Sequence, residues 1–268
     1  MSIRIVKSLP YSNMGVSAVI IALNEEKKIG RAIDSIQWAD EIVVVDSGSS
    51  DRTIEICKEK GVCLTERTFD NFASQKNYAI SLAKQEWVLS IDADEVVTPQ
   101  LAKEIRSAIA LPENIIAGYR FRRRNYFLGK LLRFARLGHE SVLRLFRKDC
   151  GRFVGVVHEE AQVDGPVITL KHILEHYGTE ALSDYFRKLK LYTDFEVERM
   201  SSEGRIPSYG KSVFYPPTKW LIDYVFCGGF LDGWHGFVYH ALSCYYGWTK
   251  NLKAQLKRNK NNKLLTLV

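Results

Sequence analysis

The first hundred residues alternate short apolar runs with segments of helical spacing, and this alternation limits the possible fold more than any other feature of the chain. Apolar runs of four to eight residues are typical of strands buried on both faces of a parallel sheet. We expect such strands at residues 16–23, 41–45, 62–65 and 87–91, and helices at 27–38, before Gly61, at 71–84 and from Thr98-Pro99 onward. Strands that alternate with helices in this way form a doubly wound, mostly parallel α/β sheet.

Beyond residue 115 the pattern changes, first to arginine-rich strands and then to helices. Strands are expected at residues 118–127, 141–147 and 153–157. From Glu180 the apolar residues have helical spacing. Because proline interrupts a helix, we expect Pro207, Pro216 and Pro217 to break this helical part into pieces.

Length and cysteine content exclude several classes of protein. A chain of 268 residues can bury a sizeable core without covalent cross-links. Its five cysteines are widely spread and form no CxxC pair, which argues against a zinc knuckle and a disulfide framework and favours a reducing compartment. The first fifteen residues lack the apolar segment of a signal peptide, and no run of about 18 apolar residues is present. We therefore expect a cytoplasmic protein without a simple spanning helix.

The net charge of +7 is concentrated in two basic regions. Residues 118–148 contain ten Lys or Arg and one acid, and the last 20 residues contain six Lys or Arg and no acid. Such regions suit the phosphates of a nucleotide, a lipid headgroup or a nucleic acid, although no recognition-helix, RNP or zinc-finger pattern supports the last. The arginines of the first region form either a solvated strand face or, as we favour, a binding site for a phosphorylated ligand. They are Arg120, Arg122, Arg123, Arg124, Arg133 and Arg136.

Polar clusters follow three of the expected strands: Asn24-Glu25, Asp46-Ser47 and Asp92-Ala93-Asp94. In an open α/β sheet, ligands bind beyond the carboxyl ends of the strands. Carboxylates at this edge can accept hydrogen bonds from a nucleobase and a ribose. They can also hold a divalent cation against a diphosphate, because hard cations prefer oxygen ligands.

Of the three clusters, the Asp92-Ala93-Asp94 turn most specifically indicates a metal site. Carboxylates two residues apart after a strand can share one metal ion, and the metal makes a departing diphosphate a better leaving group. A simple acidic turn before the helix at Thr98 is the structural alternative. The same residues also match the DxDxV of haloacid-dehalogenase-like phosphatases, but the later acidic pair that those enzymes need is missing from the sequence.

The motifs together resemble the front half of a family 2 glycosyltransferase with the GT-A fold. They occur in order as VIIALNEEKKIGRAIDSI, EIVVVDSGSSDRTIEI, a helix with Gln75-Lys76-Asn77, and EWVLSIDADE. Farther along, RLFRKDCGRFVGVVHEEAQV, ILEHYGTEALSDYFRKLKLYTDFE and FCGGFLDGWHGFVYHALSCYYGW are similar to the lipopolysaccharide-core glucosyltransferase branch. The resemblance implies a GT-A domain at residues 1–178, with a nucleotide half at about 15–110 and an acceptor half at about 111–178. A helical, aromatic-rich and basic extension then occupies residues 179–268.

The resemblance also implies roles for the residues at the strand ends. Asn24, Glu25 and the backbone around Ala22 and Leu23 are expected to line the nucleoside pocket. Many members of the family have Asp-Asp where this chain has Asp46-Ser47, and Asp46 is expected to contact the base with Ser47 beside it; a helix start is the structural alternative for Asp46. The remaining assignments are Lys76 near the nucleotide, Asp92 at the ribose or metal, and Asp94 as the main metal ligand.

An inverting transferase needs a carboxylate that deprotonates the acceptor hydroxyl. The branch has His-Glu at this point of the chain, so we choose Glu159 as the base, with Glu160 as the second choice because adjacent strand residues face opposite ways. For His158 a packing role is favoured. His176 lies where GT-A folds place a histidine as a further metal or diphosphate contact, and a buried structural histidine is an equal alternative; an imidazole would suit Mn²⁺ better than Mg²⁺.

The last third of the chain suggests a membrane surface. Twelve of the 31 aromatic residues lie within residues 214–248, and the basic C-terminal region follows. Aromatic and basic residues favour the interface of an anionic bilayer, although an aromatic helix packed on the catalytic domain or a dimer contact explains them equally well.

The function implied is metal-assisted transfer of a sugar from a UDP-sugar, with glucose as the expected sugar and Mn²⁺ or Mg²⁺ as cofactor. The acceptor implied is the inner core of lipopolysaccharide, at the cytoplasmic face of the inner membrane. Alternatives are an acceptor in another surface polysaccharide, a non-catalytic nucleotide-sugar-binding module, and a nucleic-acid-binding protein.

Overall fold

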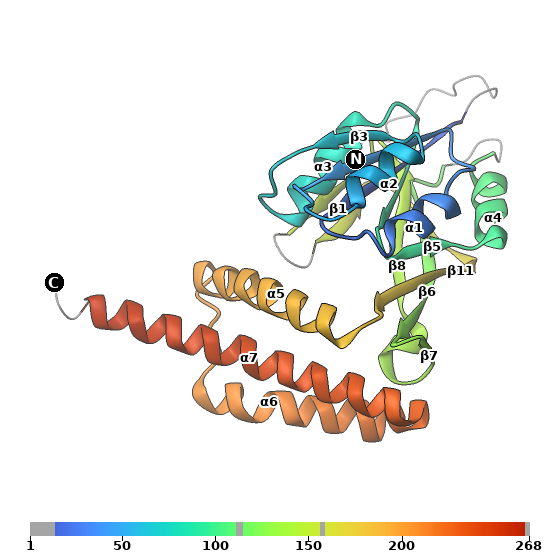
Figure 1. The fold of residues 1–268 in the computed structure, drawn as a ribbon. Coiled ribbons are helices and arrows are strands. Elements are labelled where there is room, and N and C mark those ends of the chain that lie inside the picture. The colour runs from blue at the N-terminus through green and yellow to red at the C-terminus, as the bar shows by residue number, and fades with distance from the viewer. Residues whose placement is uncertain (1–13, 111–114, 156–158, 266–268) are drawn as a thin grey trace, which may run out of the picture. The chain divides into compact units, whose positions relative to one another are not determined.

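The structure, a computed structural model, describes residues 14–110, 115–155 and 159–265 and divides into two compact units (Figure 1). The first unit comprises the described residues up to Arg122 together with Ser141–Gly155 and Glu159–Glu175. The second comprises Arg123–Glu140 and the chain from His176 onward. Strands β6 and β11 run from one unit into the other.

Nine of the described strands form one sheet with the order β3-β2-β1-β4-β8-β6-β11-β5, in which β7 pairs with β6. Strands β3, β2, β1 and β4 are parallel neighbours, whereas β8 is antiparallel to both β4 and β6. The bounds are β1 Val16–Ala22, β2 Glu41–Asp46, β3 Cys63–Glu66, β4 Trp87–Asp92, β5 Glu95–Val97, β6 Gly118–Phe127, β7 Lys130–Leu132, β8 Ser141–Arg147 and β11 Val167–Thr179. This architecture confirms the predicted α/β class, with a parallel half of the sheet at residues 16–92 and helices at the C-terminal end.

Helices cover both faces of the parallel strands, because successive side chains of a strand point to opposite faces. On one face, Ile20 and Leu89 pack with apolar side chains of α1, α2 and α4. On the other face, Val43 and Val88 pack with α3 and with Phe146 of β8. The helices are α1 Ile29–Ser35, α2 Thr53–Glu59, α3 Phe72–Leu82 and α4 Pro99–Ile109. Helix α4 begins as predicted, since the Thr98 side chain accepts a hydrogen bond from the Leu101 amide.

Four strands, β5, β7, β10 and β11, were not anticipated from the sequence. Strands β9 (Gly151–Val154) and β10 (Glu160–Val163) form a two-stranded antiparallel sheet. The strand predicted at 153–157 corresponds to β9, which begins two residues earlier. Residues 156–158 lie outside the described residues. Among the four missed strands, β11 has 13 residues. Its sequence shows neither a continuous apolar run nor a clean alternation of polar and apolar residues. Most of its side chains are partly or fully exposed, so burial imposes no such pattern on them.

The second unit contains the short helical turns η1 to η3 and three longer helices that lie together in Figure 1, with α7 between α5 and α6. Their bounds are η1 Ala135–His139, α5 Leu182–Ser202, α6 Tyr209–Leu221, η2 Ile222–Phe226, η3 Gly229–Asp232 and α7 Gly233–Leu265. In the part of the chain that the structure describes, none of the helices is both long and apolar enough to cross a bilayer.

The prediction that Pro216 and Pro217 break the helical part was wrong, because α6 runs through both. A proline inside a helix leaves the carbonyl four residues earlier without its N–H partner. For Pro217 that carbonyl belongs to Val213, and the indole N–H of Trp248 on α7 donates to it at 2.9 Å. Gly247 permits the close approach, since a Cβ at that position would lie 3.1 Å from Pro216. Packing against α7 therefore replaces a hydrogen bond that the local sequence forbids.

Candidate functional site

The ends of three parallel strands lie at one level of the sheet. Ala22 at the end of β1 is in register with Asp46 at the end of β2, and Ile21 is in register with Asp92 at the end of β4. The sheet therefore brings together the three polar clusters that the sequence placed after separate strands. Because these are the carboxyl ends of parallel strands, this edge is where an α/β sheet binds ligands.

The loops that follow β1 and β2 are joined by hydrogen bonds. Asn24 has a left-handed backbone (φ 54°), which asparagine tolerates better than most residues. Its side-chain oxygen accepts from the Ser50 amide at 2.8 Å, and its own amide donates to Ser49 Oγ at 2.8 Å. The Glu25 amide donates to Thr53 Oγ1, also at 2.8 Å. Ala22 is buried and Leu23 is exposed, so the predicted nucleoside residues form one firmly held loop.

Asp46 is fully buried, and its carboxylate organises the loop that follows it. One oxygen accepts from the amides of Gly48 and Ser49 at 2.8 and 2.7 Å, and the other accepts from the Ser49 hydroxyl. Ser47 Oγ accepts from the buried Gln75 of α3 at 3.0 Å. Asp46 therefore forms the turn after β2, which is the structural alternative considered from the sequence. Its contact with a nucleobase stays a prediction.

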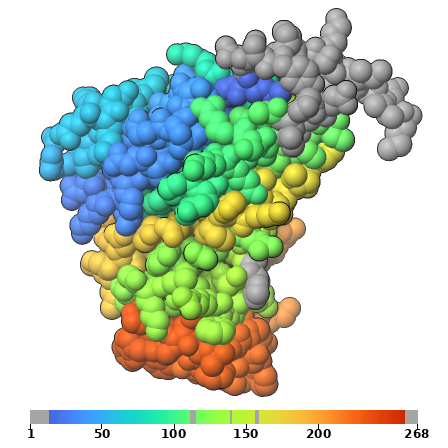
Figure 2. Space-filling view, turned by 90° about the vertical axis from the view of Figure 1, so that its right-hand side faces the viewer, coloured from blue at the N-terminus to red at the C-terminus, as the bar shows by residue number. Residues whose placement is uncertain are grey.

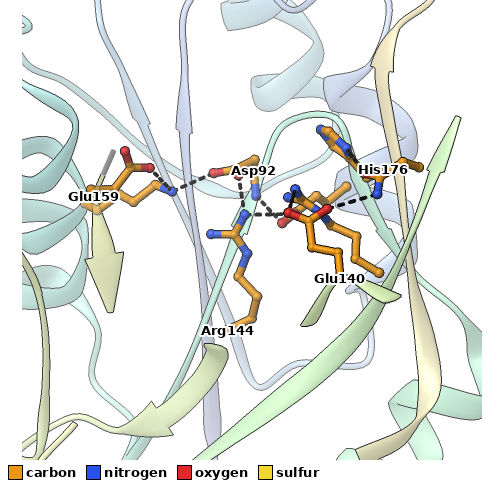
Figure 3. Close-up of polar contacts among 9 residues, drawn as sticks. Asp92, Glu140, Arg144, Glu159 and His176 are labelled. Atoms are coloured by element: carbon orange, nitrogen blue, oxygen red, sulfur yellow. Dashed lines mark hydrogen bonds and ion pairs between the residues drawn. The ribbon is translucent and has the colours of Figure 1, made fainter. Parts of the chain in front are cut away.

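Lys76 links two of the predicted site residues. Its ammonium group lies 2.7 Å from Asp92 Oδ1 and 2.8 Å from Glu159 Oε1, and its side chain is only 3% exposed. The Glu159 and Asp92 carboxylates that it contacts are labelled in Figure 3. The geometry follows from the fold, since Asp92 shares the face of β4 that packs against α3, the helix that carries Lys76. Glu160, the second choice for the base, begins β10 and is exposed.

Arg144 of β8 is a member of this cluster that the sequence reasoning missed. Its guanidinium is ion-paired with Asp92 and lies 2.7 Å from Glu95 Oε1, and the Asp92 amide donates to the other Glu95 oxygen at 3.0 Å (Figure 3). Burial by itself lowers the pKa of Arg144, but the charges of Asp92 and Glu95 outweigh it and raise the pKa well above its ordinary value. Arg144 and Glu95 thus hold the start of the acidic turn from both sides.

Asp94 lies near a second buried lysine, Lys28, with 3.8 Å between the ammonium nitrogen and the nearest carboxylate oxygen. Lys28 was also missed, although it lies within the first motif. The side chains of this cluster carry four carboxylates and three cations: Asp92, Asp94, Glu95, Glu159, Lys28, Lys76 and Arg144. The cluster is therefore not cationic enough by itself to neutralise a diphosphate.

A divalent cation fits this donor set only together with a substrate. Among the described residues, no three His, Cys, Asp or Glu side chains converge into a complete metal cage. Magnesium-type sites often use one or two carboxylates and complete their coordination with phosphate oxygens and water. Asp92 and Asp94 are the predicted ligands that would supply oxygen atoms to such a site, and Asp92 would then share its carboxylate with Lys76 and Arg144.

His176, the third predicted metal ligand, belongs to the second unit and takes part in a chain of polar contacts there. Its Nδ1 lies 2.8 Å from Asn125 Oδ1, and Asn125 in turn donates to Glu140 Oε2 at 2.9 Å. Arg123 donates to Glu140 Oε1 at 2.7 Å. Burial raises the pKa of Glu140, but the Arg123 charge and the bonds from Asn125 and Arg123 outweigh it, so the pKa lies below its usual value. If Nδ1 carries the proton, the Nε2 lone pair is the one suited to a metal.

Several basic side chains in the two basic regions of the sequence are ion-paired with acids of this chain. Within the arginine block, Arg123 and Arg136 are ion-paired with Glu140 and Asp223, whereas Arg120, Arg122 and Arg124 are exposed. In the C-terminal region, three lysines of α7 are paired with acids of α5. These pairs are Lys250 with Glu196, Lys253 with Asp194 and Lys257 with Glu198.

Comparison with known proteins shows the family to which this chain belongs. The sequence profile of glycosyl transferase family 2 matches residues 17–156. The lipopolysaccharide core biosynthesis glycosyltransferase LpsC of Rhizobium meliloti (strain 1021) is 30% identical over 243 residues, which is 85% of this chain and 90% of that protein.

Solved structures are more distant. S. aureus TarS shares 17% identity at a TM-score of 0.48 over 75% of this chain, which spans 46% of the TarS chain. Glucosyl-3-phosphoglycerate synthase from Mycobacterium tuberculosis, crystallised with Mn²⁺, UDP and glucosyl-3-phosphoglycerate, shares 17% identity at a TM-score of 0.46 over 74% of this chain and 82% of that chain.

Proposed function

This chain belongs to glycosyltransferase family 2 and is therefore an enzyme that uses a nucleotide-sugar donor, and from that premise we propose that it transfers a sugar from a UDP-sugar to a glycolipid acceptor with inversion. The observation that carries the proposal is the Lys76 bridge. It joins Glu159, the predicted base, to Asp92 of the predicted nucleotide site through contacts of 2.8 and 2.7 Å. A single displacement requires the base and the donor to be held close together, and Lys76 contacts a residue of each.

The donor lies along the edge where β1, β2 and β4 end. The loop at Asn24 and Glu25 lines the nucleoside, with Asp46 and Ser47 toward the base. The cations Lys28 and Lys76 lie near Asp94 and Asp92, where the diphosphate would need charge compensation. A divalent cation held by Asp94 and Asp92 would neutralise the departing diphosphate. His176 is a further predicted contact of the metal or the diphosphate.

Glu159 takes the proton of the acceptor hydroxyl as that oxygen attacks the anomeric carbon. The new bond joins the acceptor oxygen to the anomeric carbon, and the bond from that carbon to the diphosphate oxygen breaks. UDP leaves with the electron pair of the broken bond. Lys76 holds the Glu159 carboxylate in place before the reaction, and its proximity to Asp92 couples base position to donor position.

The acceptor we propose is a lipopolysaccharide core, at the cytoplasmic face of the inner membrane. The support is the Rhizobium relative, a lipopolysaccharide core biosynthesis glycosyltransferase that is similar over 85% of this chain. Glucose as the donor sugar rests on the resemblance of the later motifs to the glucosyltransferase branch. The exposed Arg120, Arg122 and Arg124 are the candidates for contacts to acceptor phosphates.

The test is a UDP-release assay over a panel of UDP-sugars, with a bacterial glycolipid extract and with Mn²⁺, Mg²⁺ or EDTA. The variants are Asp94→Ala, Glu159→Gln and, as the matched control for the base, Glu160→Gln. We expect release with one sugar only when metal and extract are present, and a loss of about 10²-fold or more for the first two variants. Glu160→Gln should keep nearly full activity.

Other outcomes would change the proposal. Full activity of Glu159→Gln together with loss in Glu160→Gln would move the base to Glu160. UDP binding without release for any sugar would favour a binding module. Release that is equal with EDTA and with metal would remove the metal from the mechanism.

A further inference from the structure

Helix α7 exposes a stripe of large apolar side chains along most of its length. The spacing of three, four or eight residues places them on one side of the helix. Trp234 is 69% exposed and Leu252 is 61% exposed. The members of this α7 stripe are Trp234, Phe237, Tyr245, Trp248, Leu252 and Leu256.

The buried positions of α7 have the opposite character. Gly236, His240, Asn251 and Ala254 are buried, as is Gln255, whose amide donates to Ser212 Oγ at 3.0 Å. A surface helix of a soluble protein buries its apolar side and exposes its polar side. Helix α7 therefore keeps large apolar side chains partly exposed: Phe237 and Tyr245 pack on Trp220 and Phe186 but stay 41% and 48% exposed.

The elements before α7 continue this apolar surface. Val213 is 53% exposed and lies beside Trp248, which donates to its carbonyl. Phe214 and Phe226 are 70% and 76% exposed. In Figure 2 the part of the surface coloured orange to red, which comes from α6 to α7, is in open view. An exposed apolar area of this extent marks a surface that contacts something outside the chain.

The charges of this region decide between possible partners. From residue 205 to the end, the sequence has nine Lys or Arg but only two acids, Asp223 and Asp232. Each of these acids is only 4% exposed. Asp223 is paired with Lys219 and Arg136, and Asp232 accepts from the amides of Arg133 and Phe134. The neighbouring acids of α5, Asp194, Glu196 and Glu198, are paired with lysines of α7. From residue 180 to the end the sequence has 13 Lys or Arg and eight Asp or Glu, so the surface around the α7 stripe belongs to a part of the chain with a net positive charge.

We propose that the α7 stripe, with Val213, Phe214 and Phe226, docks on the surface of an anionic lipid bilayer. Apolar side chains enter the interface, where tryptophan and tyrosine are favourable, and basic residues meet anionic headgroups. A second copy of this chain would bring a like-charged surface against it, which is unfavourable. The inference deepens the proposed function, since it gives the enzyme a place beside a lipid-linked acceptor, but it is tested by binding rather than by transfer.

The test is flotation of the full-length protein with vesicles of phosphatidylethanolamine and phosphatidylglycerol, and with neutral phosphatidylcholine vesicles. Variants Trp234→Glu and Leu252→Glu place a charge in the stripe at highly exposed positions. The matched control is Ile115→Glu, because Ile115 is a 78% exposed apolar residue of the first unit. Circular dichroism and UDP affinity report whether each variant keeps its fold and its donor site.

We expect the wild type and Ile115→Glu to float with the anionic vesicles and to bind neutral ones more weakly. Each stripe variant should bind the anionic vesicles about tenfold more weakly, with unchanged UDP affinity. The proposal is overturned if the wild type does not float, or if both stripe variants bind as the wild type does. It is also overturned if sedimentation shows a stable dimer that Leu252→Glu dissociates, because the face would then belong to a second copy. Vesicle binding without sugar transfer would leave the docking surface intact and count against the proposed function alone.

Discussion

The two units of this enzyme distribute apolar and charged side chains in opposite ways. In the first unit, α4 turns Leu101, Ile105 and Ile109 into the core, and the buried charges gather at one edge of the sheet. In the second unit, α7 exposes its apolar side, whereas Asp232 is buried against backbone amides. The difference teaches that the apolar side chains of α4 stabilise their own unit, while those of α7 are available to a partner.

The largest effect should come from Arg144, a buried charge of the first unit. We expect Arg144→Met to lower the free energy of unfolding by about 3–5 kcal/mol, because it leaves Glu95 and Asp92 without their shared cation. We also expect Arg144→Lys to fold and to raise the KM for the UDP-sugar, since Asp92 would be held less firmly. Chemical denaturation and initial-rate kinetics check these two results. An unchanged KM in Arg144→Lys would mean that Arg144 supports the fold without positioning the acidic turn.

A pair of alanine substitutions tests the contrast between the two helices directly. Ile105→Ala on α4 should cost about 3 kcal/mol of unfolding free energy, because Ile105 is fully buried. Leu252→Ala on α7 should change it by less than about 0.5 kcal/mol, because Leu252 is 61% exposed. Urea unfolding without lipid measures both values. A large cost at Leu252 would show that the apolar stripe is covered in solution, and the contrast between the helices would fail.

Asp232 tests what buried charge does in the second unit. Its carboxylate accepts from the Arg133 and Phe134 amides at 3.0 and 3.1 Å. Asp232→Ala should therefore lower the unfolding free energy by about 2 kcal/mol. Turnover per folded molecule should stay unchanged, in contrast to Arg144→Lys. Asp232→Asn, which keeps an acceptor oxygen, should restore part of the stability.

The smallest expected effect is a pH dependence at Glu140. Its pKa is lowered in the folded state, so its contribution to stability is present above the unfolded pKa and is lost as pH falls through the folded one. Glu140→Gln should thus be less stable than the wild type by about 1 kcal/mol near pH 7, and the difference should shrink below about pH 4. Denaturant midpoints at several pH values measure the difference. A gap that is constant with pH would mean that the charge of Glu140 contributes nothing.

Strands β1, β2 and β4 could be predicted because each is a largely apolar run with a polar cluster at its end. Strand β11 could not, because its half-exposed residues lack both a continuous run and a clean alternation. The same limit applies to α6, where the local signal of Pro217 was outweighed by a hydrogen bond from Trp248, 31 residues farther along the chain.

The candidate site shows the same division. Residues after strands could be predicted, since the topology of a parallel sheet brings strand ends together. Arg144 was missed because it lies in an arginine-rich region that suggested exposure. One signal was available: it stands inside the apolar run Val142–Phe146, where a charged residue needs a buried partner. Lys28 offers no such signal, because only the fold brings it to Asp94.

The exposed side of α7 has a further consequence, for the way in which the enzyme finds its acceptor. A protein held at a bilayer searches for a lipid-linked substrate in two dimensions, and each acceptor that diffuses past is already at a high effective concentration. Under these conditions the acceptor site can bind weakly and still be occupied, which also lets the product leave quickly. Lateral diffusion, rather than affinity for the sugar chain, would then govern how often the enzyme and its acceptor meet.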